Sequence, residues 1–106
     1  MRKAVQSSRD VVIQTDNWTK ALEFYEATLG FPVSHRSPDL VGFDTGAFTL
    51  YVEKGNWPGP VFDFLVSDVP STKSSLLAAG CTIVGENPAI PRYYIRDPFG
   101  LVFDIE

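Results

Sequence analysis

The chain closes with Arg92-Tyr-Tyr-Ile-Arg-Asp-Pro-Phe-Gly-Leu-Val-Phe-Asp-Ile-Glu106, in which a turn signal separates two runs of aromatic and β-branched residues. Such runs are typical of β-strands, and the Asp-Pro-Phe-Gly segment between them is typical of a turn. The pattern therefore predicts a β-hairpin at the end of the chain. Its final run, Phe103-Asp-Ile-Glu106, has a counterpart of similar pattern in Leu50-Tyr-Val-Glu53, which indicates that this strand occurs twice.

The first half of the chain predicts a strand, a helix and three further strands. Residues 11–15 form a β-branched run that predicts a strand, and Asp16-Asn17 after it can cap a helix. Apolar residues then recur at helical spacing, and a glycine ends the pattern. The helical positions are Trp18, Leu22, Tyr25, Leu29 and the closing Gly30, and the strand-like runs cover residues 31–36, 40–44 and 48–53.

The second half repeats this order after a short linker. Residues 55–60, Gly-Asn-Trp-Pro-Gly-Pro, are rich in proline and glycine and predict the linker. Residues 61–67 alternate apolar and polar side chains, and Asp68 after them can cap a helix that ends at Gly80. Three more strands are predicted at residues 81–84, 92–95 and 101–106.

The spacing between the two halves is nearly constant. The helix caps Asn17 and Asp68 lie 51 positions apart, and the closing glycines Gly30 and Gly80 lie 50 apart. A constant period is the mark of an internal repeat. The sequence therefore predicts an α+β fold of two βαβββ modules, residues 1–54 and 61–106, joined by the linker 55–60 within one compact domain.

The composition excludes several classes of protein. The chain has 106 residues, 44% of them hydrophobic, and a net charge of −4 with scattered Lys and Arg, which argues against a nucleic-acid partner. No apolar run is long enough to span a membrane, and the basic start lacks the apolar core of a signal peptide. Cys81 is the only cysteine and forms no internal disulfide. We therefore expect a cytoplasmic protein.

Three motifs occur in order over nearly the whole chain: Ala21-Leu-Glu-Phe-Tyr-Glu-Ala-Thr-Leu-Gly-Phe31, Val66-Ser-Asp-Val69 with Ala78-Ala-Gly80, and Arg96-Asp-Pro-Phe-Gly100. Together they resemble the vicinal oxygen chelate superfamily, also called the glyoxalase/bleomycin resistance/dioxygenase superfamily. The resemblance implies paired βαβββ modules whose mixed sheets curl around a ligand cavity. It also commonly implies a homodimer.

The resemblance further implies which residues face the cavity. In metal-dependent members, four strand positions supply ligands that are usually His, Gln or Glu, and these positions match Asp10, Tyr51, Val61 and Asp104 here. Two aspartates, a phenol and a valine are not a set that zinc, iron or nickel prefers. The only histidine, His35, matches none of the four. We therefore expect no metal ion and no other cofactor.

Three of these residues have candidate roles in binding. Phe103 and Ile105 are expected to face the helix, so alternation directs Asp104 into the cavity. Asp10 is expected either to form a second carboxylate at the cavity mouth or to be a solvated strand residue. Tyr51 is expected either to stack on, or hydrogen-bond to, a ligand or to fill the cavity itself.

Other aromatic residues allow two interpretations. Trp57 in the linker would be a lid over the ligand or, as we favour, an anchor against the sheets. Trp18 is predicted to be core. His35 is predicted to be a surface strand residue, and the alternative is a role in acid–base chemistry. Tyr93 and Tyr94 are adjacent on a strand, so one of them faces the cavity, and the sequence does not decide which.

These observations favour a metal-independent binder of a small, partly aromatic molecule, in the manner of antibiotic sequestration. One alternative is a metal-dependent lyase, isomerase or dioxygenase of the same superfamily. A second alternative is a non-catalytic interaction module whose cavity is filled by its own side chains. The residues predicted to bind the ligand are Asp10, Tyr51, Val61, Asp104 and Trp57, and no catalytic residue is predicted.

Overall fold

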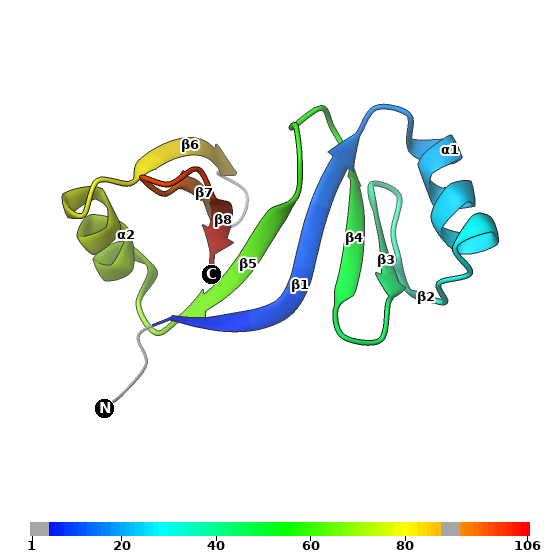
Figure 1. Cartoon of the computed structure of the whole chain (residues 1–106), viewed down its shortest axis with the longest axis horizontal. Coiled ribbons are helices and arrows are strands. Elements are labelled where there is room, and N and C mark those ends of the chain that lie inside the picture. The colour runs from blue at the N-terminus through cyan, green and yellow to red at the C-terminus, as the bar shows by residue number, and fades with distance from the viewer. Residues whose placement is uncertain (1–4, 88–91) are drawn as a thin grey trace. The chain divides into compact units, whose positions relative to one another are not determined.

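The computed structural model describes residues 5–87 and 92–106 and has the predicted α+β fold, with the predicted order of elements written twice (Figure 1). None of the helices in this part of the chain has the length and apolar character needed to span a membrane. The elements are β1 (Val5–Thr15), α1 (Trp18–Glu23), the π-helical turn η1 (Phe24–Thr28), β2 (Val33–Arg36), β3 (Leu40–Asp44), β4 (Thr49–Lys54), β5 (Val61–Val66), α2 (Val69–Ala78), β6 (Thr82–Asn87), β7 (Arg92–Arg96) and β8 (Val102–Ile105).

The chain divides into two compact units. The first unit is Arg9–Pro60, and the second comprises Val61–Glu106 together with the start of β1 as far as Ser8. The predicted linker, residues 55–60, lies within the first unit. The module limits 1–54 and 61–106 describe the sequence repeat and stay a prediction.

The first unit is a sheet with a helix on one face. Its strands follow the order β2-β3-β4-β1, in which β1 and β4 are parallel and the other neighbours antiparallel. Val41, Phe43 and Val52 form the buried core on one face of this sheet. Trp18 and Leu22 of α1 pack against them, which confirms the predicted core position of Trp18.

The second unit repeats this arrangement. Its strands follow the order β5-β8-β7-β6, with β5 and β8 parallel and the other neighbours antiparallel. Ile95, Phe103 and Ile105 form the buried core. Val69 and Leu76 of α2 pack against that core, so each unit buries one face of its sheet under its own helix.

A register irregularity recurs at the same place in both units. The β2–β3 pairing shifts between Val33 and His35, and the β6–β7 pairing shifts between Ile83 and Gly85. Both residues of the second pair lie 50 positions after those of the first, which is the period predicted from the helix ends. A bulge interrupts the alternation of side chains, so the residue after it can face the side opposite to the one that sequence parity suggests.

The helix of the first unit changes its winding halfway along. After α1 the backbone forms a π turn, in which the Leu29 N–H donates to the Phe24 carbonyl, five residues earlier, at 3.0 Å. The wider turn rotates the following residues around the helix axis. Tyr25 still packs on the core, but Leu29 is 48% exposed, so its predicted place on the apolar stripe is wrong. Gly30 ends the helix with φ 76°, as predicted.

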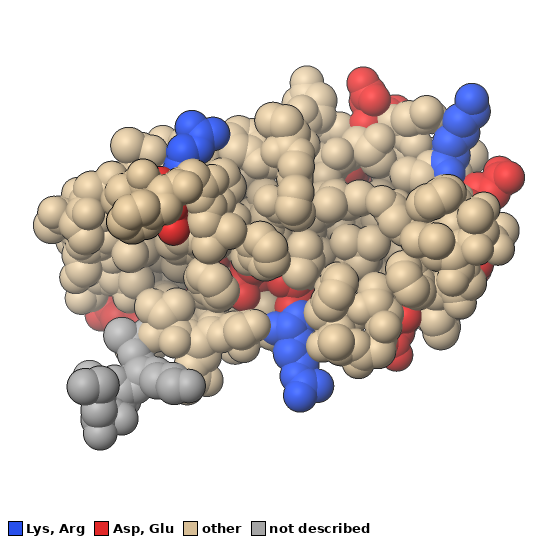
Figure 2. Space-filling view, in the orientation of Figure 1, with Lys and Arg blue, Asp and Glu red and all other residues tan. Residues whose placement is uncertain are grey.

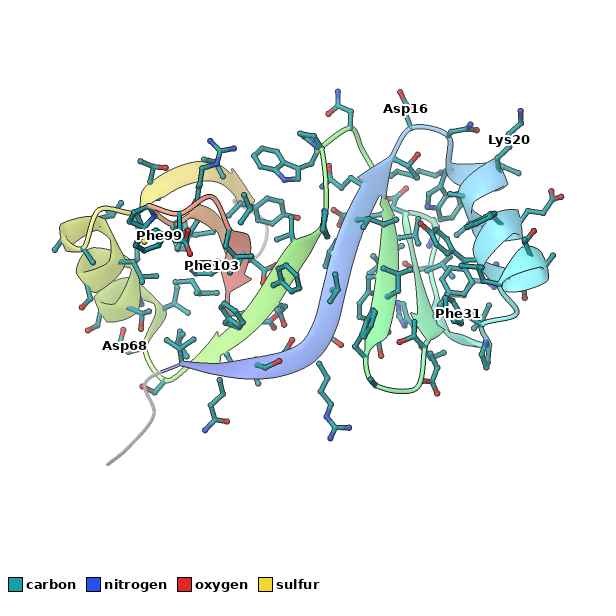
Figure 3. All side chains as sticks on the ribbon, viewed as in Figure 1. Asp16, Lys20, Phe31, Asp68, Phe99 and Phe103 are labelled. Carbon is teal, nitrogen blue, oxygen red and sulfur yellow. The ribbon has the colours of Figure 1, made fainter. Side chains whose placement is uncertain are left out.

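The two helices begin differently. The Asp68 carboxylate accepts a hydrogen bond from the Ser71 N–H at 3.1 Å, so the predicted cap of α2 is confirmed (Figure 3). Asn17 holds the equivalent position before α1, but its side chain makes no capping bond. Its backbone N–H donates to Thr15 Oγ1 at 3.0 Å instead. Only Asp68 therefore stabilises a helix start through its side chain.

We expect Asp68→Ala to lower the free energy of unfolding by about 1 kcal/mol, because the substitution removes a side-chain cap. Asn17→Ala is the matched control and is expected to cost about 0.5 kcal/mol or less. Urea denaturation of both variants measures the difference. Equal losses in the two variants would show that the Asp68 bond contributes nothing beyond an ordinary surface polar group.

Candidate functional site

Asp104 lies in the middle of β8, on the face of the sheet opposite α2. Its neighbours Phe103, labelled in Figure 3, and Ile105 are buried in the core against that helix. Because side chains alternate along a strand, Asp104 points to the other face, as the sequence predicts. The residue is nevertheless 0% exposed, so its carboxylate is withdrawn from solvent.

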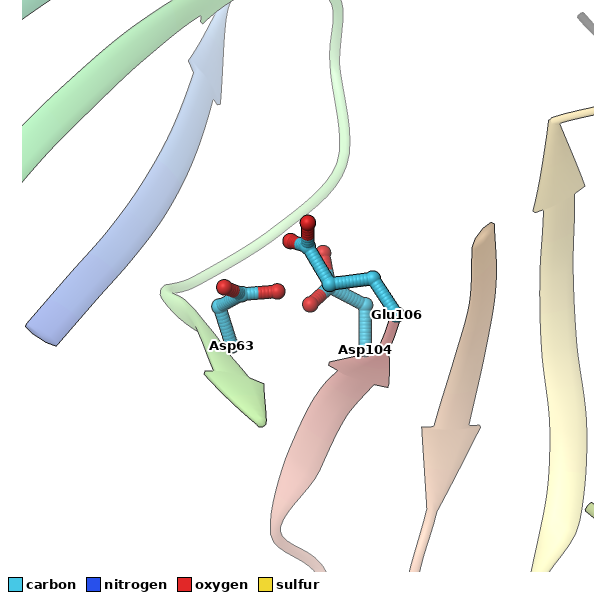
Figure 4. A group of neighbouring side chains, drawn as sticks. All are labelled: Asp63, Asp104 and Glu106. Carbon is cyan, nitrogen blue, oxygen red and sulfur yellow. The ribbon is translucent and has the colours of Figure 1, made fainter. Parts of the chain in front are cut away.

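Asp63 stands next to Asp104 as its register partner on the parallel strand β5 and is 3% exposed. Asp63, Asp104 and the exposed Glu106 form a group that we call the acidic cluster (Figure 4). A carboxylate oxygen from each of the three lies within 4.8 Å of the others. Carboxylates withdrawn from water need cationic or hydrogen-bond-donating groups beside them.

Tyr94 borders the acidic cluster on the other side of Asp104. It is the register partner of Asp104 on β7 and lies against Gly85 of β6. Tyr93, by contrast, packs on the core of the second unit, where Lys73 Nζ lies 4.3 Å from the centre of its ring. The alternative left open by the sequence is thereby resolved: Tyr94, not Tyr93, shares the face of Asp104.

Tyr51 is the counterpart of Asp104 in the first unit. It pairs with Val12 across parallel strands, as Asp104 pairs with Asp63. Val12 and Asp63 lie 51 positions apart, which is the predicted period. The predicted strand match therefore places Tyr51 and Asp104 at equivalent register positions. Chemically the two positions differ, because one unit presents a phenol and the other a buried carboxylate.

The remaining predicted residues are distributed over both units. In the first unit, Asp10 is half-buried and pairs with Thr49, and the Trp57 backbone N–H donates to Gln14 Oε1 at 3.1 Å. In the second unit, Val61 is buried at the start of β5. Its side chain has no atom that can hold a polar group or a metal, so any contact with a ligand would be apolar.

Asp63, Glu106 and Tyr94 are not among the site residues predicted from the sequence. The position of Asp63 could have been predicted, because Phe62-Asp-Phe64 alternates in the same way as Phe103-Asp-Ile105. Phe64 packs on the core, so its neighbour must face the other side. Glu106 lies two residues after Asp104, so alternation predicts that it shares the face of Asp104. The sequence alone does not distinguish Tyr94 from Tyr93.

The residues at the four positions implied by the resemblance do not fit a transition-metal ion. Val61 offers no ligand atom, and neither Asp10, Tyr51 nor Asp104 supplies the imidazole that zinc, iron and nickel prefer. The acidic cluster is a different donor set. Three carboxylates suit a hard cation such as Mg²⁺, Ca²⁺ or Mn²⁺.

On the face shown in Figure 2, Lys and Arg side chains stand apart from one another and form no basic patch. Two ion pairs are exposed, one between Arg36 and Glu26 at 3.9 Å and one between Lys54 and Asp39 at 3.8 Å. Exposed pairs of this kind contribute little to stability.

A family profile described as "Glyoxalase-like domain" matches residues 10–106 of the chain. The chain belongs to the glyoxalase-like domain family. This glyoxalase-like protein therefore lies within the superfamily that its motifs resemble. A search of curated protein sequences finds no significant match.

Solved structures share the fold of the glyoxalase-like chain at low sequence identity. A glyoxalase/bleomycin resistance protein/dioxygenase superfamily member from Vibrio splendidus is 16% identical, with a TM-score of 0.66 over 90% of this chain and 93% of that one. NAD-dependent benzaldehyde dehydrogenase from Legionella pneumophila is 18% identical, with a TM-score of 0.72 over 91% and 95%. The Mn(II)-bound glyoxalase from Novosphingobium aromaticivorans is 19% identical, with a TM-score of 0.62 over 96% and 38%. Proteins with such different names share the fold, so the fold assigns no single activity.

Proposed function

We propose that this glyoxalase-like protein is a metal-independent binder of a small, partly aromatic molecule that carries a cationic or hydrogen-bond-donating group. The observation that carries the proposal is the pair of buried carboxylates, Asp63 and Asp104, on the face away from α2. Tyr94, the register partner of Asp104, adds an aromatic ring on the same face. Sequestration of an antibiotic is one use of such a site.

Each element of this arrangement has a chemical role in the proposal. Asp104 accepts hydrogen bonds from the donor group of the ligand, and Asp63 adds negative charge beside it. Tyr94 offers an aromatic face, which attracts both planar rings and cations. In the first unit, Tyr51 offers a second aromatic surface, and Asp10 a further carboxylate. Val61 and Trp57, the other two predicted site residues, would supply apolar contact.

A metal-dependent lyase, isomerase or dioxygenase is the second candidate. It is favoured by the acidic cluster, because three convergent carboxylates can hold a hard divalent cation. The Mn(II)-bound glyoxalase shows that a protein of this fold can hold such an ion. The donor set at the four family positions weighs against this candidate, since Val61 cannot ligate and imidazole is missing from all four.

We expect protein purified without chelator to carry less than a stoichiometric amount of transition metal, as measured by inductively coupled plasma mass spectrometry. The reason is the poor donor set at Asp10, Tyr51, Val61 and Asp104. Asp104→Asn is the companion sample. One equivalent of manganese, iron, nickel or zinc in the wild type, lost in Asp104→Asn, would favour the second candidate instead.

Two further properties belong to the proposal. We propose a homodimer, because β2 and β6 end the sheets of their units and apolar side chains such as Leu77, Phe99 and Leu101 are exposed. Light scattering in the micromolar range tests this and should give twice the monomer mass. We also propose a cytoplasmic location, which suits the buried thiol of Cys81.

A further inference from the structure

Tyr51 lies over a glycine on the face of the first unit that points away from α1. Its register partner across the antiparallel strands is Gly42 of β3. A Cβ atom on Gly42 would lie 2.9 Å from Tyr51 Cε1 and 3.2 Å from Cδ1, which is closer than side chains pack. Gly42 has no left-handed backbone angle, so its conformation does not demand glycine. Glycine at this position leaves the space that the Tyr51 ring occupies against the sheet.

His35 reaches the same face through the β-bulge in β2. Val33, two residues earlier, packs on the core under α1, so simple alternation would send His35 to the core as well. The register shift between the two residues re-aims His35, and its Cβ lies 3.3 Å from the position of a Cβ on Gly42. Bulges of this kind often re-aim a side chain beside a functional site.

The two rings form a corner rather than a stack. The centres of the His35 and Tyr51 rings are 6.3 Å apart, and their planes are inclined by 63°. His35 is exposed and Tyr51 is half-buried, so the corner is open to solvent on the His35 side. A planar ring placed there can meet one aromatic face and one aromatic edge, which is the arrangement that aromatic groups prefer.

One end of this face is fixed by hydrogen bonds. Gln14 donates to Glu53 Oε1 at 2.7 Å and accepts from the Trp57 backbone N–H at 3.1 Å. Gly55 makes room for this side chain, because a Cβ at that position would overlap Gln14. Glu53 and Tyr51 share a face of β4, so the hydrogen-bonded pair of Gln14 and Glu53 lies on the same face as the corner, two residues further along the strand.

We propose that His35 and Tyr51, seated on Gly42, form an aromatic platform that binds the planar ring of a small-molecule ligand. The inference rests on the proposed function as a small-molecule binder and adds to it the chemical class that the first unit recognises. It also assigns His35, which matches none of the four family positions, to ligand binding. Neither the acidic cluster nor a metal ion takes part in this contact.

The test uses His35 as its own reporter, because it is the only histidine in the chain. In protein labelled with ¹³C-histidine, benzyl alcohol is titrated as an aromatic probe and cyclohexylmethanol as its saturated analogue. We expect a saturable change in the His35 ring signals with benzyl alcohol and a change at least fivefold smaller with cyclohexylmethanol. No saturable change with benzyl alcohol, or equal changes with the two probes, would overturn the platform.

Three variants sharpen the test. Gly42→Ala and Tyr51→Leu are expected to weaken the benzyl alcohol response at least tenfold, the first by displacing the ring and the second by removing it. Gly85→Ala is the matched control, because a Cβ there meets Tyr94 only at an ordinary 3.5 Å, and it should keep the response. If Gly42→Ala fails to fold, Tyr51→Leu alone decides, and an unchanged response in it contradicts the proposal. If the benzyl alcohol response is absent but an aromatic amine still binds in a way that depends on Asp104, the platform is wrong and the proposed function is not affected.

Discussion

Phe103→Ala is expected to lower the free energy of unfolding by about 3–5 kcal/mol, the range for a phenylalanine removed from a packed core. Phe103 is 6% exposed, and its ring centre lies 5.0 Å from that of Phe64. It also shares the buried core of the second unit with Ile95 and Ile105. A small domain has only about 5–15 kcal/mol of stability in total, so the loss is a large share of it. Urea denaturation gives the midpoint and slope from which the difference is calculated.

The control for this prediction is the same substitution four positions earlier. Phe99 stands in the turn between β7 and β8 and is 94% exposed, so Phe99→Ala should change the free energy of unfolding by about 0.5 kcal/mol or less. Comparable losses in the two variants would mean that Phe103 does not face the core. The orientation of Asp104 would then be wrong as well, because it follows from that of Phe103.

The second large effect is expected on binding. Asp104→Asn keeps the shape of the side chain but removes its charge, and we expect it to weaken binding of an aromatic amine such as benzylamine by about ten- to a hundredfold. A hydrogen bond to a charged group contributes about 1.5–3 kcal/mol to binding. Each loss of about 1.4 kcal/mol weakens the affinity tenfold, which gives the expected range. Isothermal titration calorimetry measures the change.

Asp39→Asn is the matched control for charge. The Asp39 side chain is 81% exposed and faces Lys54, so the variant changes the net charge by the same amount without touching the acidic cluster. Its affinity for benzylamine should stay within about twofold of the wild type, since exposed charges are screened by salt. An equal loss in both variants would indicate a general electrostatic effect and would contradict a contact with Asp104.

Much of the fold could be predicted from the sequence because local signals and the repeat agree. Turn residues separate the strands, Asp68 caps its helix, and the interval of about 50 residues recurs in the helix ends and in the β-bulges. The direction of Asp104 was predictable for the same reason. No bulge interrupts β8, so Phe103 and Ile105 fix it by alternation.

What could not be predicted depends on breaks in regular geometry. The π turn moves Leu29 away from the apolar face of the helix. The spacing of apolar residues in the sequence does not predict the extra residue in that turn. The bulge after Val33 places His35 beside Tyr51, against simple alternation. Tyr93 and Tyr94 could be told apart only from the pairing of β7 with β8, which places Tyr94 opposite Asp104.

The most direct test of metal-independent binding is the melting temperature of the wild-type protein with benzylamine in the presence of EDTA. A ligand that binds only the folded state raises the melting temperature, and the rise grows with the logarithm of the ligand concentration once that concentration exceeds the dissociation constant. The account predicts a dose-dependent rise that is the same with and without EDTA. A rise that appears only after Mn²⁺ or another divalent cation is added, or no rise at any concentration, would contradict it.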